Sequence, residues 1–130
     1  MKTILVDAVD TFVVEADGAF KIFKEMQDLL DTFPNRKILI TGATDEQSRV
    51  WFAEKMPYEI FTLRHDPEKT DPEYFRKLLE HFNLIKDDAV YFEHNPEAAR
   101  SAESVGIKTY HYDNDVRDLK ALKEFLVKNL

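Results

Sequence analysis

The stretch Lys2–Phe12, KTILVDAVDTF, decides how the rest of the chain is interpreted. In it an aliphatic run, Ile4–Val6, leads directly into Asp7. A short, continuous apolar run that ends in turn-type residues is typical of a strand buried on both faces. A carboxylate at the carboxyl end of such a strand faces the crevice where open α/β sheets bind ligands. Asp7 is therefore a candidate nucleophile or metal ligand, although a loop aspartate can also simply cap a backbone amide.

The composition is that of a soluble globular protein of one domain. The chain has 130 residues, of which 44% are hydrophobic and 33% charged, and these proportions allow a real core. Its net charge of −7 argues against binding to nucleic acid or to anionic membranes, because neither supplies a countercharge. The absence of cysteine excludes disulfides, thiolate zinc sites and a cysteine nucleophile. The N-terminal segment has neither a signal-peptide nor a membrane-span pattern, so we expect a cytoplasmic protein.

Strand-like and helix-like segments alternate along the chain. Further apolar runs of strand length cover 37–41, 58–63, 89–92 and 107–110. Apolar residues at helical spacing predict helices over 19–33, 44–56, 71–82, 95–105 and from 115 onward. Residues 13–18 have room only for a tight hairpin or flap. This alternation predicts right-handed βαβ crossovers and a three-layer α/β/α sandwich around a five-stranded parallel sheet.

Local signals set several of the predicted helix boundaries. Thr44 and Gln47 have the spacing of a capping box, so a helix should start there, with Val50, Phe52 and Ala53 on its apolar side. Prolines in the sequences Asp-Pro at 71–72 and Asn-Pro at 95–96 suit the first turn of a helix. Asp115 should cap the last helix.

Polar residues follow four of the predicted strands. They are Asp7, then Thr41 and Gly42, then Arg64, His65 and Lys69, and finally Glu93, His94 and Asn95. Because the carboxyl ends of parallel strands lie on one edge of a sheet, these clusters should be neighbours in space. Two carboxylates, a hydroxyl, backbone amides and a lysine suit a phosphate bridged to a hard divalent cation. In that arrangement Asp7 would attack phosphorus, and Lys69 would offset negative charge.

The order and spacing of these clusters resemble the motifs of the haloacid dehalogenase (HAD) superfamily. VDAVDT resembles the first motif, hydrophobic-DxDGT, with Asp7 at the nucleophile and Thr11 at the threonine. ILITG resembles the second motif at Thr41, KTDPEYF the third at Lys69, and YFEHNPEAARSA the fourth at Glu93. The resemblance covers essentially the whole chain, since GIKTYHY also resembles the fifth strand. Four weak signals that agree are more specific than any one of them.

The resemblance implies a Rossmann-like sheet with strand order 5-4-1-2-3 and a Mg²⁺-dependent phosphohydrolase that works through an aspartyl-phosphate. The residues that it assigns to catalysis are Asp7, Thr41 and Lys69. The ligands that it assigns to Mg²⁺ are Asp7, the backbone carbonyl of Val9, and Glu93. The candidate substrate residues are Thr11, which the resemblance implies, and Gly42 and Arg64, which follow from their places after predicted strands, with the Gly42 amide on a phosphoryl oxygen.

The resemblance is to the capless members of the superfamily. Many members carry a helical cap after motif one, and here only 13–19 is available for one. Residues 1–130 are therefore expected to form a single HAD-like domain without a cap. Capless members have an open site, which implies phosphorylated substrates that can be large, including protein-bound or polymeric phosphates.

Several residues depart from the motifs, among them Glu93 at the first acid of motif four and Thr70 at the usual proline of motif three. Val9 stands where the family has its general acid/base, and Asp10 stands at the usual glycine. Loss of a general acid/base removes about 10²–10⁴ in rate, so an active enzyme would need good leaving groups such as acyl or aryl phosphates. His94 replaces the second acid of motif four, and imidazole suits a transition metal better than Mg²⁺. We also expect Glu93 and Asp10 to repel Asp7, so that Asp7→Asn would stabilise the fold.

Several interpretations remain open. A HAD-type phosphohydrolase without its acid/base competes with a catalytically inactive HAD-like protein that binds a phosphorylated ligand or a protein partner. His65 and His94 could jointly hold a metal. Dehalogenase-type members also lack the second aspartate, but they need a cap. A receiver domain has a similar size, but it needs a phosphoacceptor aspartate where this chain has Leu63–His65, and its strand order is 2-1-3-4-5.

Overall fold

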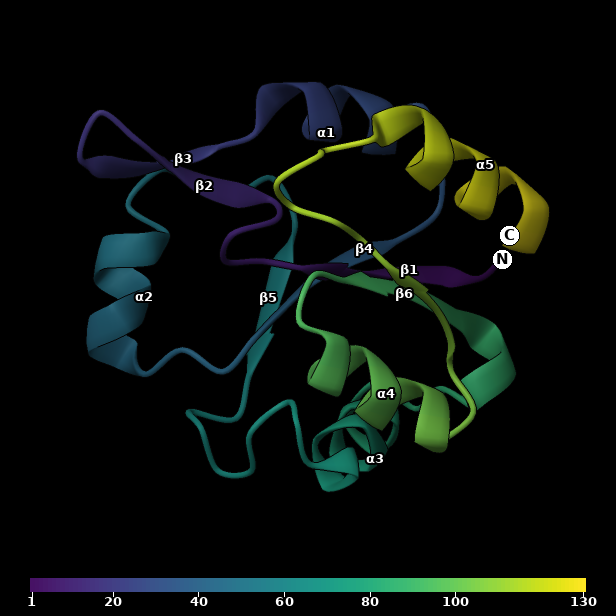
Figure 1. Cartoon of the computed structure of the whole chain (residues 1–130). Coiled ribbons are helices and arrows are strands. Elements are labelled where there is room, and N and C mark those ends of the chain that lie inside the picture. The colour runs from purple at the N-terminus through teal and green to yellow at the C-terminus, as the bar shows by residue number, and fades with distance from the viewer.

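A parallel sheet of five strands forms the middle of the molecule. Its strands are β1 (Thr3–Asp7), β4 (Lys37–Thr41), β5 (Glu59–Thr62), β6 (Ala89–Glu93) and β7 (Lys108–His111). The computed structural model describes residues 1–130, and its strands lie in the order β5-β4-β1-β6-β7 (Figure 1). β1 is central, with β4 and β6 as parallel partners, and every one of its residues is buried. This is the environment that its unbroken aliphatic run predicts.

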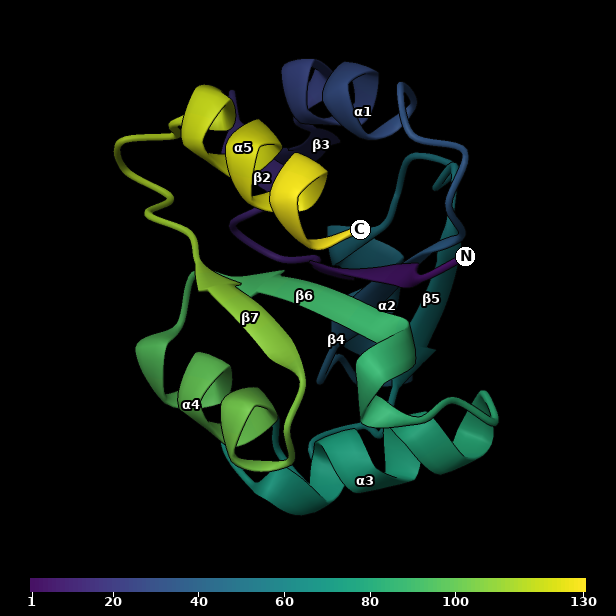
Figure 2. The same cartoon turned by 90° about the vertical axis from the view of Figure 1, so that its right-hand side faces the viewer.

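Helices cover both faces of the sheet. One face carries α1 (Lys24–Leu30) and α5 (Leu119–Asn129), and the other carries α3 (Pro72–His81) and α4 (Pro96–Ser104) (Figures 1 and 2). A short 3₁₀ helix, Lys86–Asp88, precedes β6. None of the helices is long and apolar enough to cross a membrane.

Two hydrophobic cores follow from the alternation of side chains along β1. Ile4 and Val6 pack in the core that also contains Leu126 of α5, whereas Leu5 packs in the core with Phe75 of α3. Successive strand residues point to opposite faces, so Asp7 is directed toward the same side as Leu5. The nucleophile candidate therefore lies on the side of the sheet that α3 and α4 cover.

A separate antiparallel hairpin follows β1. It consists of β2 (Val13–Ala16) and β3 (Ala19–Ile22), joined at Asp17 and Gly18. Both turn residues have positive φ, 53° and 79°, as a two-residue type I′ turn requires. The hairpin lies beside α2 (Asp45–Trp51), to which the amide of Ile22 is linked through the carboxylate of Glu54 just beyond that helix.

The hairpin corrects two expectations. The helix predicted from residue 19 begins only at Lys24, because the Asp-Gly turn folds 19–22 back as a strand. The expected order 5-4-1-2-3 numbers five strands along the chain, whereas this chain has seven strands, of which five form the parallel sheet. In its own numbering the sheet order is β5-β4-β1-β6-β7, because β2 and β3 form a second sheet. The α/β architecture and the parallel sheet are confirmed.

The starts of α2, α3 and α4 match the local signals, whereas α2 ends at Trp51 instead of near residue 56 and the last helix starts later than predicted. The capping box at Thr44 is present, and the predicted Asp71 and Asn95 are the N-caps of α3 and α4. The last helix is capped by Asp118 instead of Asp115, because the carboxylate of Asp113 accepts the Asp115 amide at 2.9 Å and forms a turn first. The predicted apolar side of α2 holds only in part, since Val50 is 61% exposed and the helix buries no residue, whereas Phe52 just after it packs against the core.

Candidate functional site

Asp7 ends β1 in a pocket of hydrogen-bond donors and is 1% exposed. Its Oδ1 accepts a hydrogen bond from Lys69 Nζ at 2.7 Å. Its Oδ2 accepts from the Thr11 hydroxyl at 2.7 Å, from the His94 amide at 3.1 Å and from His94 Nδ1. Burial raises the pKa of Asp7, but the Lys69 ammonium and the His94 hydrogen bond outweigh burial and hold the pKa well below its usual range. Asp7 is therefore an ionised carboxylate.

Glu93 ends β6 and is fully buried beside Asp7. Its Oε1 accepts from Lys69 Nζ at 2.6 Å and from the Tyr91 hydroxyl. Its Oε2 accepts from the Asn95 amide at 3.0 Å and lies 3.3 Å from His94 Nδ1. Burial and the nearby Asp7 charge raise the pKa of Glu93. The four contacts occupy about all of the acceptor positions that a carboxylate has.

Two cations balance the two carboxylates. Lys69 lies just before α3, and its ammonium bridges Asp7 and Glu93 with 17% of its side chain exposed. Burial lowers the pKa of Lys69, but the two carboxylates outweigh burial and raise the pKa above its usual value. The hydrogen bonds from His94 to Asp7 and Glu93 raise the pKa of that imidazole to about 10. Lys69 and His94 therefore place two basic groups against the two buried carboxyl groups.

The charge cluster opens into a cavity of about 300 Å³ at the carboxyl edge of the sheet. Other residues that line this cavity are Val9, Asp10, Thr41, Gly42, Trp51, His65, Glu68 and Asn95. The cavity therefore brings together residues from the ends of β1, β4 and β6 and from the loop before α3, as expected for the carboxyl edge of a parallel sheet.

Unused hydrogen-bond donors follow β4. The Thr41 oxygen accepts the Ala43 amide at 3.2 Å, but its hydroxyl donates to no group of the protein. The Gly42 amide likewise donates no hydrogen bond within the chain. A Cβ on Gly42 would lie 3.0 Å from His65 Nδ1, so glycine leaves room for the imidazole at the rim. Both free donors can point to an anionic oxygen in the cavity.

Two predicted substrate residues do not line the cavity. Arg64 is exposed, does not line the cavity, and pairs with Asp45 through Nε at 2.9 Å. Thr11 is buried and donates its hydroxyl to Asp7, so it positions the carboxylate instead of facing a ligand. The two histidines are also separate. His65 contacts Glu68 and Gln47, and the group of possible metal ligands contains His94 without it.

Asp7, Glu93 and His94 each offer a ligand atom, all within 4.8 Å of one another, so this group could hold a metal ion. Mg²⁺, however, prefers about six oxygen ligands in octahedral geometry. Here His94 Nδ1 lies between the two carboxylates, and the Glu93 oxygens are already occupied by donors. The arrangement does not fit Mg²⁺ unless the imidazole leaves. The predicted Mg²⁺ site at Asp7, Val9 and Glu93 therefore stays a prediction.

The sequence left three contributors without a role. Tyr91 supplies a buried hydroxyl to Glu93, and the period of two along β6 already placed both residues on one face. Tyr74 of α3 donates its hydroxyl to the Thr41 carbonyl at 2.7 Å and ties β4 to α3 behind the cavity. Trp51 reaches the cavity from the end of α2. Only tertiary packing reveals the last two.

Solved structures resemble this fold, although no protein-family model matches the sequence and no curated protein matches it. The magnesium complex of HAD family enzyme BT-2542 from Bacteroides thetaiotaomicron has a TM-score of 0.72 and 12% identity, covering 94% of this chain and 98% of that one. The wild-type BT-2542 complex with magnesium and inorganic phosphate has a TM-score of 0.66 and 12% identity, covering 85% and 93%. A 2-haloacid dehalogenase from Pseudomonas syringae pv. Tomato DC3000 has a TM-score of 0.65 and 20% identity, covering 84% and 54%.

The sheet order separates this fold from the receiver alternative. A receiver would pair its first strand with the second and third strands of the sheet, whereas β1 pairs with β4 and β6, the second and fourth. The chain therefore has the fold of the HAD-like superfamily.

Proposed function

We propose that the cavity binds the phosphoryl group of a phosphate monoester or acyl phosphate and that Asp7 hydrolyses it slowly through an aspartyl-phosphate. The observation that carries this proposal is the Lys69 bridge between Asp7 and Glu93, next to the unused donors of Thr41 and Gly42. A cation and free donors around a carboxylate suit a phosphoryl group under attack. The likeness to BT-2542, a HAD family enzyme crystallised with inorganic phosphate, supports the proposal.

The reaction needs only groups that line the cavity. Asp7 Oδ1, which Lys69 alone contacts, attacks phosphorus as the bond to the leaving oxygen breaks, and the leaving group departs with that electron pair. The Thr41 hydroxyl and Gly42 amide hold phosphoryl oxygens, and Lys69 offsets their charge. Water then attacks the phosphorus of the aspartyl-phosphate. The bond to Asp7 breaks, the water proton goes to phosphate, and the carboxylate is restored.

The proposed activity is limited to good leaving groups. Val9 lines the cavity and has no proton to give, and Asp10 is exposed with a φ of 66° in the turn that follows. Without a general acid the leaving oxygen departs as an anion, which favours aryl and acyl phosphates over alkyl phosphates.

In this proposal, Lys69 and His94 supply the positive charge beside the phosphoryl group. Mg²⁺ bound by Asp7, the Val9 carbonyl and Glu93 would add Lewis-acid charge there, but it would have to displace the His94 imidazole first. We therefore propose that Mg²⁺ binds weakly. The only insertion after β1 is the hairpin of β2 and β3, which supports a capless single domain and an entrance open to large phosphorylated substrates.

A second candidate function is phosphate-ligand binding without catalysis. The observation that favours it is the closed network of donors around Asp7, which holds the carboxylate in place and lowers its nucleophilicity. In this case the cavity would serve a phosphorylated ligand or a phosphorylated partner protein.

Turnover of p-nitrophenyl phosphate tests the proposal and separates the two candidates. We expect slow release of p-nitrophenol by the wild type and none by Asp7→Asn, with inorganic phosphate acting as a competitive inhibitor. Phosphate binding by calorimetry without any turnover would favour the binding protein. If the protein shows no phosphate binding and no turnover, both candidate functions are removed.

A further inference from the structure

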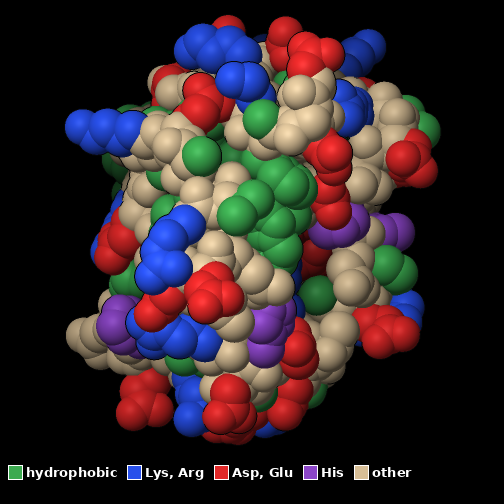
Figure 3. Space-filling model, turned by 90° about the vertical axis from the view of Figure 1, so that its left-hand side faces the viewer, with side chains coloured by type: hydrophobic (Ala, Val, Ile, Leu, Met, Phe, Trp, Pro, Cys, Tyr) green, Lys and Arg blue, Asp and Glu red, His purple; other side chains and the backbone are tan.

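Trp51 gives the cavity an aromatic wall. It is the only tryptophan of the chain, ends α2, and lines the same cavity as Asp7 and Lys69. Its ring centroid lies 6.3 Å from that of Phe20 on β3, so the hairpin supports the indole from outside the cavity. Figure 3 shows this side of the molecule, where hydrophobic side chains gather near the centre with histidine and acidic side chains beside them.

The cavity is otherwise polar. Of its twelve lining residues only two are hydrophobic, Val9 and Trp51. Trp51 is only partly buried, so part of its apolar surface remains available to a ligand. Planar aromatic groups stack on an indole with a gain in affinity beyond that of the apolar area they bury. A ligand with an aromatic ring next to its phosphoryl group can therefore use the anion site and the indole together.

Val9 points to the same kind of ligand for a separate reason. Where a carboxyl would protonate the leaving oxygen, the cavity is lined by Val9, whose partly buried side chain also packs against the core and carries no proton to donate. A phenolate leaves without protonation far more readily than an alkoxide, because a phenol is the stronger acid. The apolar wall and the missing proton donor therefore select the same leaving group.

We propose that the site takes aryl phosphates, with the phosphoryl group at Lys69 and Thr41 and the aromatic ring against Trp51. This inference rests on the proposed phosphoryl site and adds the chemical class of its substrate. Asp10 and Glu68 line the cavity as well, so the ring should be neutral or cationic. An aryl group that carries its own carboxylate is disfavoured by the repulsion between like charges.

The fluorescence of Trp51 reports directly on this subsite, because no other tryptophan contributes. Phenyl phosphate should change the Trp51 emission, whereas inorganic phosphate should bind without doing so. Phenyl phosphate should also bind about threefold to tenfold more tightly than cyclohexyl phosphate, which matches it in size but lacks a π face. A short phosphotyrosine peptide, compared with phenyl phosphate, distinguishes a protein-bound source of the aryl phosphate from a small molecule.

Variants of α2 separate stacking from simple folding effects. By calorimetry, Trp51→Leu should lower the affinity for phenyl phosphate to the cyclohexyl level and leave inorganic phosphate binding unchanged. Trp51→Phe should restore most of the difference. Val50→Ala is the matched control, since Val50 lies on the same helix, is 61% exposed and does not line the cavity. Circular dichroism establishes that each variant is folded.

Two results would overturn the inference, and they differ in what else they remove. Equal affinities for phenyl and cyclohexyl phosphate, with phosphate binding intact, would exclude the aryl subsite and leave the phosphoryl site standing. No binding of any of the three anions would remove the phosphoryl site as well.

Discussion

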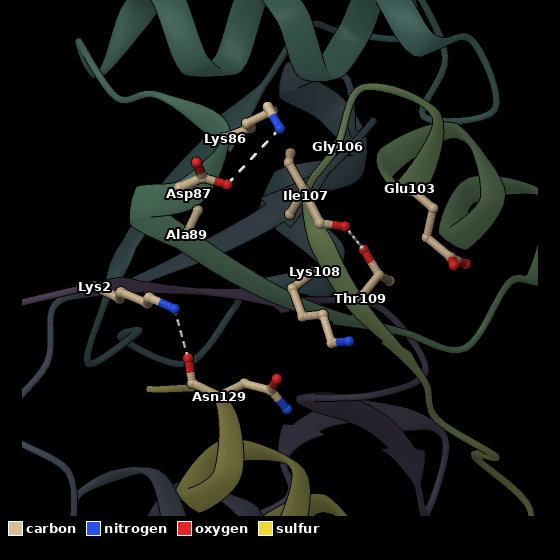
Figure 4. Close-up of a pocket in the computed structure, with 10 residues that line it drawn as sticks. All are labelled: Lys2, Lys86, Asp87, Ala89, Glu103, Gly106, Ile107, Lys108, Thr109 and Asn129. Carbon is tan, nitrogen blue, oxygen red and sulfur yellow. Dashed lines mark hydrogen bonds and ion pairs between the residues drawn. The ribbon is translucent and has the colours of Figure 1, made fainter.

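The two ends of the sheet carry two cavities, and the smaller one is the functional candidate. At the amino edge a cavity of about 580 Å³ lies between Lys2, Lys86 and Lys108 (Figure 4). At the carboxyl edge the cavity of about 300 Å³ holds the cluster around Asp7 and Lys69. Cavity volume alone would therefore select the wrong end.

The difference between the two ends lies in how their charges are held. At the amino edge Lys86 pairs with Asp87 at 3.8 Å with both side chains more than half exposed, and Lys2 donates to the Asn129 carbonyl at 2.8 Å. At the carboxyl edge two carboxylates are buried in one network. Burial of charge is strongly unfavourable unless partners compensate it, and such clusters gather at functional sites. The comparison teaches that buried, compensated charge identifies the site better than size does.

The largest expected effect comes from removing one cation at each end. Lys69→Met leaves two buried carboxylates without their shared partner and should lower the free energy of unfolding by about 3–5 kcal/mol. Lys108→Met, at an exposed position in the other cavity, should change it by less than about 0.5 kcal/mol. Urea denaturation measures both. Equal losses would mean that the two ends do not differ as described.

Asp7→Asn comes next and reverses an expectation from the sequence. Repulsion from Glu93 and Asp10 predicted that removing this charge would stabilise the fold. In the structure Asp7 is compensated by Lys69 and His94, and Asp10 is exposed in the following turn. The variant should therefore lose about 1–3 kcal/mol in metal-free buffer, because its amide cannot replace a charged acceptor. A melting temperature above that of the wild type would restore the repulsion argument.

The comparison also shows which features the sequence can predict. The apolar run of β1 and the polar residues after each strand depend on local pattern, and they predicted the sheet and the edge at which those polar residues meet. Residues 19–23 contain apolar residues that suit a helix or a strand, and the Asp17-Gly18 turn decides between them. The orientation of His94 toward Asp7 joins residues 87 positions apart. Only the packed fold determines such a contact.

A gain of function should follow from Val9→Asp. The new carboxyl would lie two residues beyond Asp7 in the same cavity, where it could protonate a leaving oxygen. We expect about a tenfold gain with alkyl phosphates, less than a full general acid provides, and a smaller gain with p-nitrophenyl phosphate. Asp10, at the usual turn glycine, limits how well the new acid is placed. A folded variant with no turnover of either substrate would favour the inactive binding protein.

The smallest expected effect is that of Mg²⁺ on the wild type. His94 lies between the carboxylates that would bind the ion, so we expect weak binding. Mg²⁺ at a concentration close to its Kd should then raise the free energy of unfolding by less than about 1 kcal/mol. His94→Asp removes the competing imidazolium and adds a carboxylate oxygen, so it should bind Mg²⁺ at least about tenfold more tightly. Lys108→Met, at the amino edge, should leave the wild-type response unchanged. Calorimetry measures the affinity for Mg²⁺, and thermal melts with and without EDTA measure the stability that Mg²⁺ adds. Tight Mg²⁺ binding by the wild type would show that the imidazole moves aside readily, and the Mg²⁺ site predicted from the sequence would then be correct.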